Sequence, residues 1–468
     1  MKDRERLHYS ASRRSAPVYK AVLAIALAGS LALACVSPGL SRRYQNSRND
    51  LNASAGSVEI DAADEKLFAD RSSIDAATLV REVLRRNPAL RAAQQAWRAA
   101  LSRYPQETAL EDPIAVFGAA PRTFGRSSGD SSYMVELHQP LPFPGKRGLR
   151  GERALAEADA SARDLDAIRL DLAVRAQVLF SDYYLTTRAL EINAAHLGLL
   201  EDLHQSALMQ YEVGLVSQQD PLQAETERLG LVHREIELQS RLRMRVQQLN
   251  ALLHRAADLP LPAPAKRISS QTLSDDALSE AVENTIQTRP EIAAADASIA
   301  ARESAKSLAR LEFLPDFELW GKYDRYWAEN DQRPSVGVAV NIPLQLERRR
   351  GAVDEADAEL ERARSERDRL ADEIRAGVAT AAERVREQHH LRELLLTQTL
   401  PTARDRVVAA RAAYDTGKTT FIAVVDAFRG QLEAELAYQT AIAMFARRQA
   451  EFFGAAGDIN ALQAGGPQ

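Results

Sequence analysis

The side chains in this chain that could bind a metal or act as a nucleophile are few and poorly spaced. The sequence has 8 histidines, 5 methionines and 1 cysteine. His389 and His390 are adjacent, so on a helix their rings point in different directions. His196 and His204 are eight positions apart, which is too far for them to share one ion directly. Because no phosphate-binding loop, nucleophile elbow or convincing acid–base pair occurs either, we expect no enzyme, no metal site and no cofactor.

The single cysteine, Cys35, follows a segment that is typical of an export signal. Residues 1–34 carry basic side chains before the apolar run Ala21–Ala34, which ends in small residues. One interpretation is cleavage before Cys35 and acylation of its thiol, for example with palmitate, although Ala32 stands where bacterial lipoproteins usually have leucine. The other is simple cleavage that leaves an incidental cysteine. A sole cysteine at the cleavage point favours acylation, and the polar residues 35–72 after it are expected to form a flexible leader.

Net charge and hydropathy indicate whether the chain binds nucleic acid or crosses a membrane as a helix. The chain of 468 residues has 60 Lys and Arg against 65 Asp and Glu, a net charge of −5. This balance gives no support to nucleic-acid binding. No run of roughly 20 uninterrupted apolar residues occurs after residue 40, so no transmembrane helix is expected in the mature chain. Any insertion into a membrane must therefore use strands.

The elements that must position the functional residues are encoded twice. Three landmarks recur at an offset of 202 or 203 positions: Tyr211–Leu215 with Tyr414–Lys418, Asn87-Pro88 with Arg289-Pro290, and Lys146–Gly148 with Arg349–Gly351. Solenoid units span only roughly 20 to 50 residues, so this period is too long for a solenoid. It indicates a duplicated half-protein and predicts pseudo-two-fold internal symmetry.

Each half is expected to contain a helix, a strand pair and a long helical hairpin. The domains are predicted as a first repeat at 73–257, a linker at 258–275, a second repeat at 276–455 and a disordered tail at 456–468. Leucines seven positions apart in the long helices predict coiled-coil packing, with Leu222, Leu229 and Ile236 as one such stripe. Gly214 and Gly417 mark the hairpin tips because glycine readily adopts positive φ.

Two segments, 113–142 and 316–343, change to the period-two pattern of strands. Val336, Val338 and Val340 alternate with small or polar residues, so each strand has one apolar and one polar face. Such a sheet occurs at soluble surfaces, and it is also the pattern of a transmembrane barrel. The barrel is favoured because the neighbouring helices are committed to coiled coil. Four strands cannot close in lipid, so closure requires several chains, and three chains supply twelve strands.

These features together resemble the TolC-type outer-membrane efflux proteins, from about residue 74 to 455. The tandem halves and the segment Gln139–Arg147 (QPLPFPGKR) carry the resemblance. It implies a mainly α fold with a small β part. A long antiparallel α-helical coiled-coil barrel is joined to four transmembrane β-strands per chain, which close a twelve-stranded barrel as a trimer. It also implies a homotrimer in the outer-membrane lipid of a Gram-negative bacterium, which extends into the periplasm and works with a periplasmic adaptor and an inner-membrane pump.

The resemblance further implies a periplasmic gate near the hairpin tips. The aspartate of the first tip corresponds to Asp220, and its tyrosine partner corresponds to Tyr414. The arginine that completes this latch corresponds to Thr419, so that link is missing. The two constricting aspartates correspond to Ala423 and Asp426, which leaves one ring of three carboxylates in a trimer. We expect this single ring to block cations more weakly than two rings would.

Structural alternatives exist for each of these gate residues. Asp220 is also explained as a helix N-cap before Pro221, Asp426 as part of a solvated coiled-coil face, and Tyr414 as a cover for the tip glycine. Lys418 could replace the missing arginine. The rival function is a periplasmic coiled-coil adaptor or structural protein without a pore, and an enzyme is the weakest hypothesis. The sequence does not identify the substrate.

Overall fold

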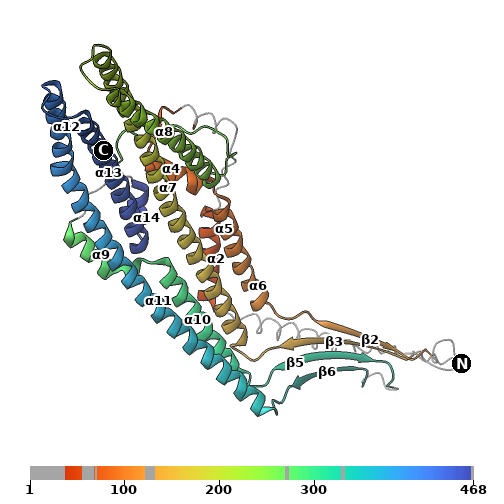
Figure 1. The fold of residues 1–468 in the computed structure, drawn as a ribbon. Coiled ribbons are helices and arrows are strands. Elements are labelled where there is room, and N and C mark those ends of the chain that lie inside the picture. Colours follow the sequence, from red (N-terminus) through yellow and green to blue (C-terminus); the bar gives the residue numbers. More distant parts are fainter. Residues whose placement is uncertain are drawn as a thin grey trace, which may run out of the picture. The chain divides into compact units, whose positions relative to one another are not determined.

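The computed structural model describes residues 37–54, 68, 71–121, 132–268, 274–327 and 332–464 (Figure 1). The chain divides into two compact units. The first contains 1–54, 96–161 and 295–366, and the second contains 55–95, 162–294 and 367–468. Each unit takes segments from both halves of the sequence. The two copies of the repeat are therefore intertwined rather than arranged as consecutive domains.

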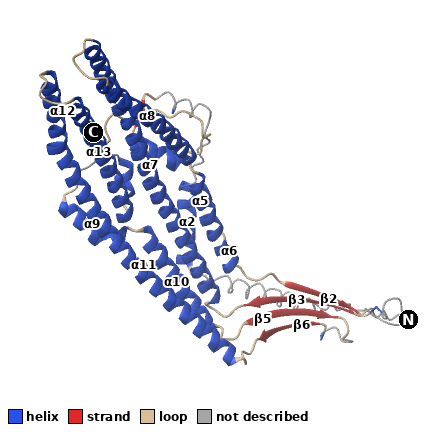
Figure 2. Ribbon diagram, viewed as in Figure 1, coloured by secondary structure: helices blue, strands red, loops and turns tan. Residues whose placement is uncertain are grey.

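Helices dominate both units (Figure 2). The helices among the described residues are α2 (Pro38–Ser54), α4 (Ala76–Arg86), α5 (Pro88–Leu101), α6 (Arg103–Thr108), α7 (Lys146–Glu212), α8 (Gln219–Leu252), α9 (Asp275–Thr288), α10 (Pro290–Leu311), α11 (Leu346–Leu394), η3 (Leu395–Thr399), α12 (Leu400–Asp415), α13 (Phe421–Ala456) and α14 (Ile459–Ala464). The predicted long hairpins are confirmed as α7–α8 and α11–α13. No helix of the described ranges is both long and apolar enough to cross a membrane.

The second unit packs four helices around one apolar seam. The buried residues of this seam come from α7, α8, α12 and α13: Leu200, Leu203, Ala207, Ala224, Leu231, Val407, Phe421, Val424, Val425, Ala427, Phe428 and Leu432. On α8 the buried positions Ala224, Leu231 and Leu238 are seven apart. The seven-residue period was predicted, and the stripe named from the sequence lies outside this seam. Leu222, Leu229 and Ile236 are 59%, 52% and 63% exposed on the single chain.

The predicted irregularity at Pro401 is confirmed. The helix that starts at Leu346 passes through the π-helix η3, Leu395–Thr399, before it continues as α12. Proline has no N–H to donate, and its ring clashes with the carbonyl four residues earlier, here that of Thr397. The wider turn of a π-helix relieves that conflict without ending the helix.

A four-stranded antiparallel sheet lies in the first unit (Figure 2). Its order is β2 (Ile114–Ala119), β3 (Tyr133–Leu141), β5 (Phe317–Asp324) and β6 (Pro334–Val340). The first-half and second-half strand pairs meet at β3–β5, where Val135 pairs with Tyr323. Trp320 interrupts the alternation and lies over its register partner Gly337. A Cβ at Gly337 would be 2.4 Å from the indole ring, so only glycine leaves room for it.

Two segments are more ordered than the sequence predicted. Residues 38–54 of the expected flexible leader form α2, which buries Leu40 and stacks Tyr44 on Tyr104 at 4.6 Å between ring centroids. The expected disordered tail contains α14, where Leu462 is fully buried and its carbonyl accepts a hydrogen bond from Gln177 at 2.7 Å. The sequence did not predict either helix because neither segment has a clear apolar periodicity. Each helix is stabilised by a few apolar contacts with distant parts of the chain.

The repeated Xaa-Pro landmarks have a common structural role in the second unit. The Asn87 side chain donates to the carbonyl of Leu252 at the end of α8, at 2.9 Å. The Arg289 side chain donates to the carbonyl of Ala455 at the end of α13, at 3.2 Å. Each of these residues therefore satisfies carbonyls that a helix C-terminus leaves without intrahelical partners. A short parallel pair, β1 (Ser73–Ile74) with β4 (Ala263–Pro264), adds the linker to the same unit.

The ends of the two returning helices differ in one residue. Gly457 follows α13 with φ 80°, and His254, its equivalent in the first half, follows α8 with φ 55°. The left-handed conformation ends many helices and favours glycine. His254 is the one non-glycine residue with positive φ among the described residues. The first half therefore carries backbone strain that the second half avoids.

Candidate functional site

The hairpin tips are built by glycines in the left-handed region. Gly214 and Gly417 have φ 77° and 69°. In each tip the glycine N–H donates to the carbonyl of the tyrosine three residues earlier, at 2.9 Å to Tyr211 and 2.8 Å to Tyr414. A Cβ on either glycine would meet open space. The conformation alone, and not crowding, therefore requires glycine at both tips, as the sequence predicted.

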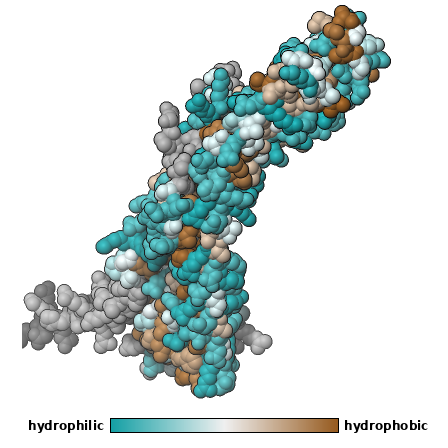
Figure 3. All heavy atoms as spheres, turned by 60° about the vertical axis from the view of Figure 1, so that its left-hand side comes forward, coloured by the Kyte–Doolittle hydropathy of each residue, from teal (hydrophilic) through white to brown (hydrophobic). Residues whose placement is uncertain are grey.

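The two tips differ in polarity. The first tip exposes large apolar side chains: Met209 is 62% exposed, Val213 70% and Leu215 76%. Apolar side chains appear in brown on this tip, at the top of Figure 3. The corresponding residues after the second glycine are Lys418 and Thr419. An exposed apolar cluster of this kind marks an interaction surface.

Tyr414 joins the two hairpins at the tips. Its hydroxyl donates to Gln210 of α7 at 3.2 Å and lies 3.5 Å from a carboxylate oxygen of Asp220 on α8. Its ring packs edge-on against Phe421, with 5.6 Å between centroids. Burial and the negative charge of Asp220 raise the pKa of Tyr414 above its ordinary value of 10.0. The neutral, hydrogen-bonding form is therefore the form present at physiological pH.

The N-cap explanation for Asp220 does not fit the structure. Helix α8 begins at Gln219 and its N-cap is Gln218, which makes no side-chain capping bond. Asp220 lies inside the first turn, where its charge interacts favourably with the helix dipole while its carboxylate faces Tyr414. Within the described part of the single chain Lys418 makes no ion pair, and its substitution for the arginine missing at Thr419 stays a prediction.

Asp426 of α13 has a basic partner on the neighbouring helix. Arg406 of α12 forms an ion pair with it, and the two side chains are 56% and 58% exposed. Ala423, one turn earlier on α13, carries no charge. Each carboxylate of a trimeric ring would thus be accompanied by an arginine. The constricting role of Asp426 stays a prediction, and this pairing places an arginine beside the carboxylate.

A second ion pair near the tips was missed from the sequence. Arg429 of α13 donates to Glu227 of α8 through Nε at 2.8 Å and also through its Nη2 atom. The two residues are 202 positions apart, one short of the offset of 203 that relates the two tips, so they lie at neighbouring and not identical positions of the two repeats. The available signal was opposite charges at nearly corresponding positions of the two returning helices, α8 and α13.

The sheet has its polarity inverted relative to a soluble sheet. On its apolar face Phe117 is 70% exposed, Leu137 49% and Val338 60%. On the opposite face the side chains of Asp324 and Glu136 are only 10% and 19% exposed, because neighbouring polar side chains cover them. A soluble protein would bury the apolar face against a helix. The exposed apolar face is instead suited to contact with an apolar environment.

Two of the histidines considered as metal ligands, His196 and His389, make other contacts. His196 is buried and its Nε2 lies 3.0 Å from Glu435 of α13. His389 packs its ring on Phe445, with 5.8 Å between centroids. Among the described residues no group of three or more His, Cys, Asp or Glu side chains is placed to hold a metal ion. Cys35 lies outside the described residues.

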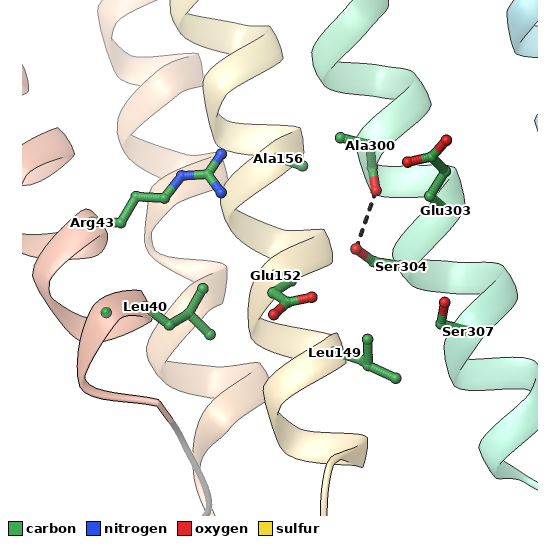
Figure 4. Close-up of a pocket in the computed structure, with 10 residues that line it drawn as sticks. Leu40, Arg43, Leu149, Glu152, Ala156, Ala300, Glu303, Ser304 and Ser307 are labelled. Atoms are coloured by element: carbon green, nitrogen blue, oxygen red, sulfur yellow. Dashed lines mark hydrogen bonds between the residues drawn. The ribbon is translucent and has the colours of Figure 1, made fainter.

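An open groove of about 500 Å³ lies within the first unit, between α2, α7 and α10 (Figure 4). Charged side chains line it from all three helices: Arg43, Glu152 and Glu303. Arg43 is engaged by an ion pair with Asp159, and Ser304 donates to the carbonyl of Ala300 at 3.1 Å. The polar groups therefore satisfy one another locally, and the groove has the character of a solvated gap between helices.

Comparison with known proteins agrees with this geometry. Residues 281–457 match the family model described as Outer membrane efflux protein. The cobalt-zinc-cadmium resistance protein CzcC of Cupriavidus metallidurans is 22% identical over 306 residues, which are 65% of this chain and 72% of that protein.

Solved structures extend the likeness to most of the fold. A membrane protein from Pseudomonas aeruginosa has a TM-score of 0.70 at 19% identity, over 82% of this chain and 91% of its own. The outer membrane protein VceC from Vibrio cholerae has a TM-score of 0.68 at 16% identity, over 82% and 96%. The second half of this chain is therefore similar to outer membrane efflux proteins, and the chain shares the fold of the solved outer-membrane proteins over most of its length.

Proposed function

We propose that three copies of this chain form a passive duct through the outer membrane, with no catalytic step of its own. The observation that carries this proposal is the inverted sheet. Its apolar face is exposed while its polar face is partly covered. Burying an exposed valine or phenylalanine in lipid instead of water stabilises it by about 1.5–3 kcal/mol. The sheet is thus suited to face lipid outward and water inward.

The edges of the sheet support a ring of several chains. Among the described strands, β2 and β6 are the two edges of the sheet and pair on their inner sides alone. Unpaired backbone groups are not tolerated in the hydrocarbon region of a membrane. The edge β2 of one copy would therefore pair with β6 of the next, and three copies give twelve strands around a water-filled interior.

The exposed stripe on α8 supports the same stoichiometry. Leu222, Leu229 and Ile236 follow the seven-residue period of coiled coils but are open to solvent on the single chain. Helix α8 already buries its other stripe against its own chain. A second apolar stripe on one helix is required when that helix packs on both sides, as it does in a closed ring of helices. The occupant we propose is the neighbouring copy.

The tips are proposed as the periplasmic gate. Tyr414 with Asp220, and Arg429 with Glu227, connect the two hairpins of one chain. Opening would require these hairpins to separate, so both contacts stabilise the closed arrangement. The apolar side chains around Gly214 are the proposed docking surface for the adaptor, which links the duct to an inner-membrane pump. Cys35 is the proposed site of acylation, three residues before α2 begins.

A pair of matched substitutions tests the orientation of the sheet. Val338 lies on the apolar face and Ala339, the next residue of β6, on the polar face opposite Glu318. Val338→Arg should abolish assembly in the outer membrane, because arginine facing lipid near the midplane costs about 2–4 kcal/mol. Ala339→Arg should assemble, since it faces water and a carboxylate. Heat-modifiable trimers in outer-membrane fractions report the outcome, and equal assembly of both variants contradicts the proposal.

Two further experiments test the duct itself. Purified protein should be a trimer in detergent and should conduct ions in planar bilayers. A protein that extracts without detergent and shows no conductance would instead be the rival, a periplasmic coiled-coil protein. Sensitivity profiling of a deletion strain identifies the substrate, and the name of the relative CzcC makes cobalt, zinc and cadmium salts the first compounds to test, beside organic drugs.

A further inference from the structure

A row of linked charged side chains crosses the polar face of the sheet. His138 of β3 lies between two carboxylates, with Nδ1 at 2.6 Å from Glu318 of β5 and Nε2 at 3.1 Å from Glu136 of its own strand. Lys322 continues the row, at 3.1 Å from Glu136 and 2.9 Å from Asp324. All five residues lie on strands β3 and β5, and they partly cover one another. Their positions are therefore set by strand register and not by flexible loops.

The contacts of His138 depend on its protonation. Ionised carboxylates only accept hydrogen bonds, and a neutral imidazole has one N–H, so both contacts can be hydrogen bonds only when both ring nitrogens carry a proton. The protonated row has two cations against three carboxylates. Loss of the proton from His138 leaves Lys322 as the single cation. Each chain then presents one more negative charge to the interior.

The neighbouring strands do not compensate for this change. On β2 the register partner of His138 is Ile114, and that of Glu136 is Val116. On β6 the partner of Glu318 is Ala339 and that of Lys322 is Ser335. Within the described strands, the titratable groups that face His138 are therefore the two carboxylates beside it and Lys322.

We propose that His138 determines the cation selectivity of the strand-lined end of the duct, with small inorganic cations as the selected class. This inference rests on the proposed function, because the row faces a conduit only when three copies close the sheet. Rings of acidic side chains attract cations into a pore. With His138 protonated the three rows are nearly balanced. With His138 neutral the same wall gains three negative charges per trimer, and the pore favours cations over anions.

Reversal potentials in planar bilayers under a KCl gradient test the proposal. Between pH 5.5 and pH 8, the ratio of potassium to chloride permeability of the wild-type trimer should rise about twofold or more, since histidine titrates in this range. His138→Gln should show the high-pH selectivity at both values, and His138→Lys the low-pH selectivity at both. His233, a 77% exposed side chain on α8, provides the matched control, and His233→Gln should behave as wild type.

The possible outcomes distinguish a failure of the selectivity role of His138 from a failure of the proposed duct. Absence of conductance in the wild-type protein overturns both the duct and the role of His138. Conductance with a pH dependence that persists in both His138 variants overturns only the selectivity role and leaves the duct intact. The glutamine and lysine variants shift selectivity in opposite directions, so a general loss of folding does not reproduce the expected pair of results.

Discussion

The ion pair between Glu227 and Arg429 is the sharpest test of the proposed gate. Replacing Arg429 with alanine removes the Nε and Nη2 bonds that join α13 to α8. The Arg429 side chain is 55% exposed, while that of Glu227 is 14% exposed. Water replaces much of what an exposed pair loses, so we take the contribution at about 1 kcal/mol per chain. Glu227 keeps one partner, the amide of Gln223 at 3.1 Å, which limits the cost of leaving its charge unpaired.

Three copies of the pair would act together if the trimer opens as one. The loss is then about 3 kcal/mol, and because each 1.4 kcal/mol is tenfold, the ratio of open to closed gates should rise about a hundredfold. Single-channel recording measures this ratio as open probability. Sensitivity of cells to large antibiotics that an intact gate excludes gives an independent measurement.

The control uses an arginine of the same kind. Arg241 on α8 is 60% exposed and pairs at 3.4 Å with Glu237 of its own helix, so Arg241→Ala breaks an ion pair without affecting any contact between hairpins. A double-mutant cycle of Arg429→Ala with Glu227→Gln isolates the coupling. If Arg429→Ala opens the channel no more than Arg241→Ala, or if the two gate substitutions are additive, the pair does not hold the gate closed.

Three other changes have defined outcomes. Tyr414→Phe removes the hydroxyl contacts with Gln210 and Asp220, and at about 0.5–1.5 kcal/mol per chain three copies should raise the ratio of open to closed gates about tenfold or more. Because the pKa of Tyr414 is raised above its ordinary value of 10.0, the wild type keeps this hydroxyl proton through pH 10 and loses it only at more alkaline pH, so opening at strongly alkaline pH should be absent from the variant. Arg406→Ala should uncover the Asp426 ring and strengthen block by periplasmic divalent cations, and Asp426→Asn in the same chain should remove that block. His254→Gly should stabilise the fold by about 1 kcal/mol in thermal unfolding by relieving its left-handed strain, whereas Gly457→Ala at the equivalent position should destabilise it, because its Cβ would lie 3.0 Å from a carbonyl oxygen. Unchanged channel or unfolding behaviour in any of these variants contradicts the corresponding contact.

Sequence reasoning located the long elements because their signals are local. A proline-free run with leucines at heptad spacing is helical wherever it lies, and Gly214 and Gly417 are needed for φ alone. The π-helix before Pro401 follows from one missing N–H. The segments α2 and α14 were missed because each is stabilised by a few contacts with remote residues, such as Tyr44 with Tyr104. Local periodicity carries no record of such contacts.

The sequence by itself determined the duplication, the alternation of the strands and the identity of the residues at the tips. Only the tertiary structure decided which of those residues meet. The repeat was visible in the sequence, but the contact of Glu227 with Arg429 depends on how the two copies pack, and packing is a property of the whole chain. The same holds for Asp426, whose charge was evident and whose partner Arg406 was not. Electrostatic roles depend on distances of a few ångströms, and those distances are established by the fold and not by the spacing along the chain.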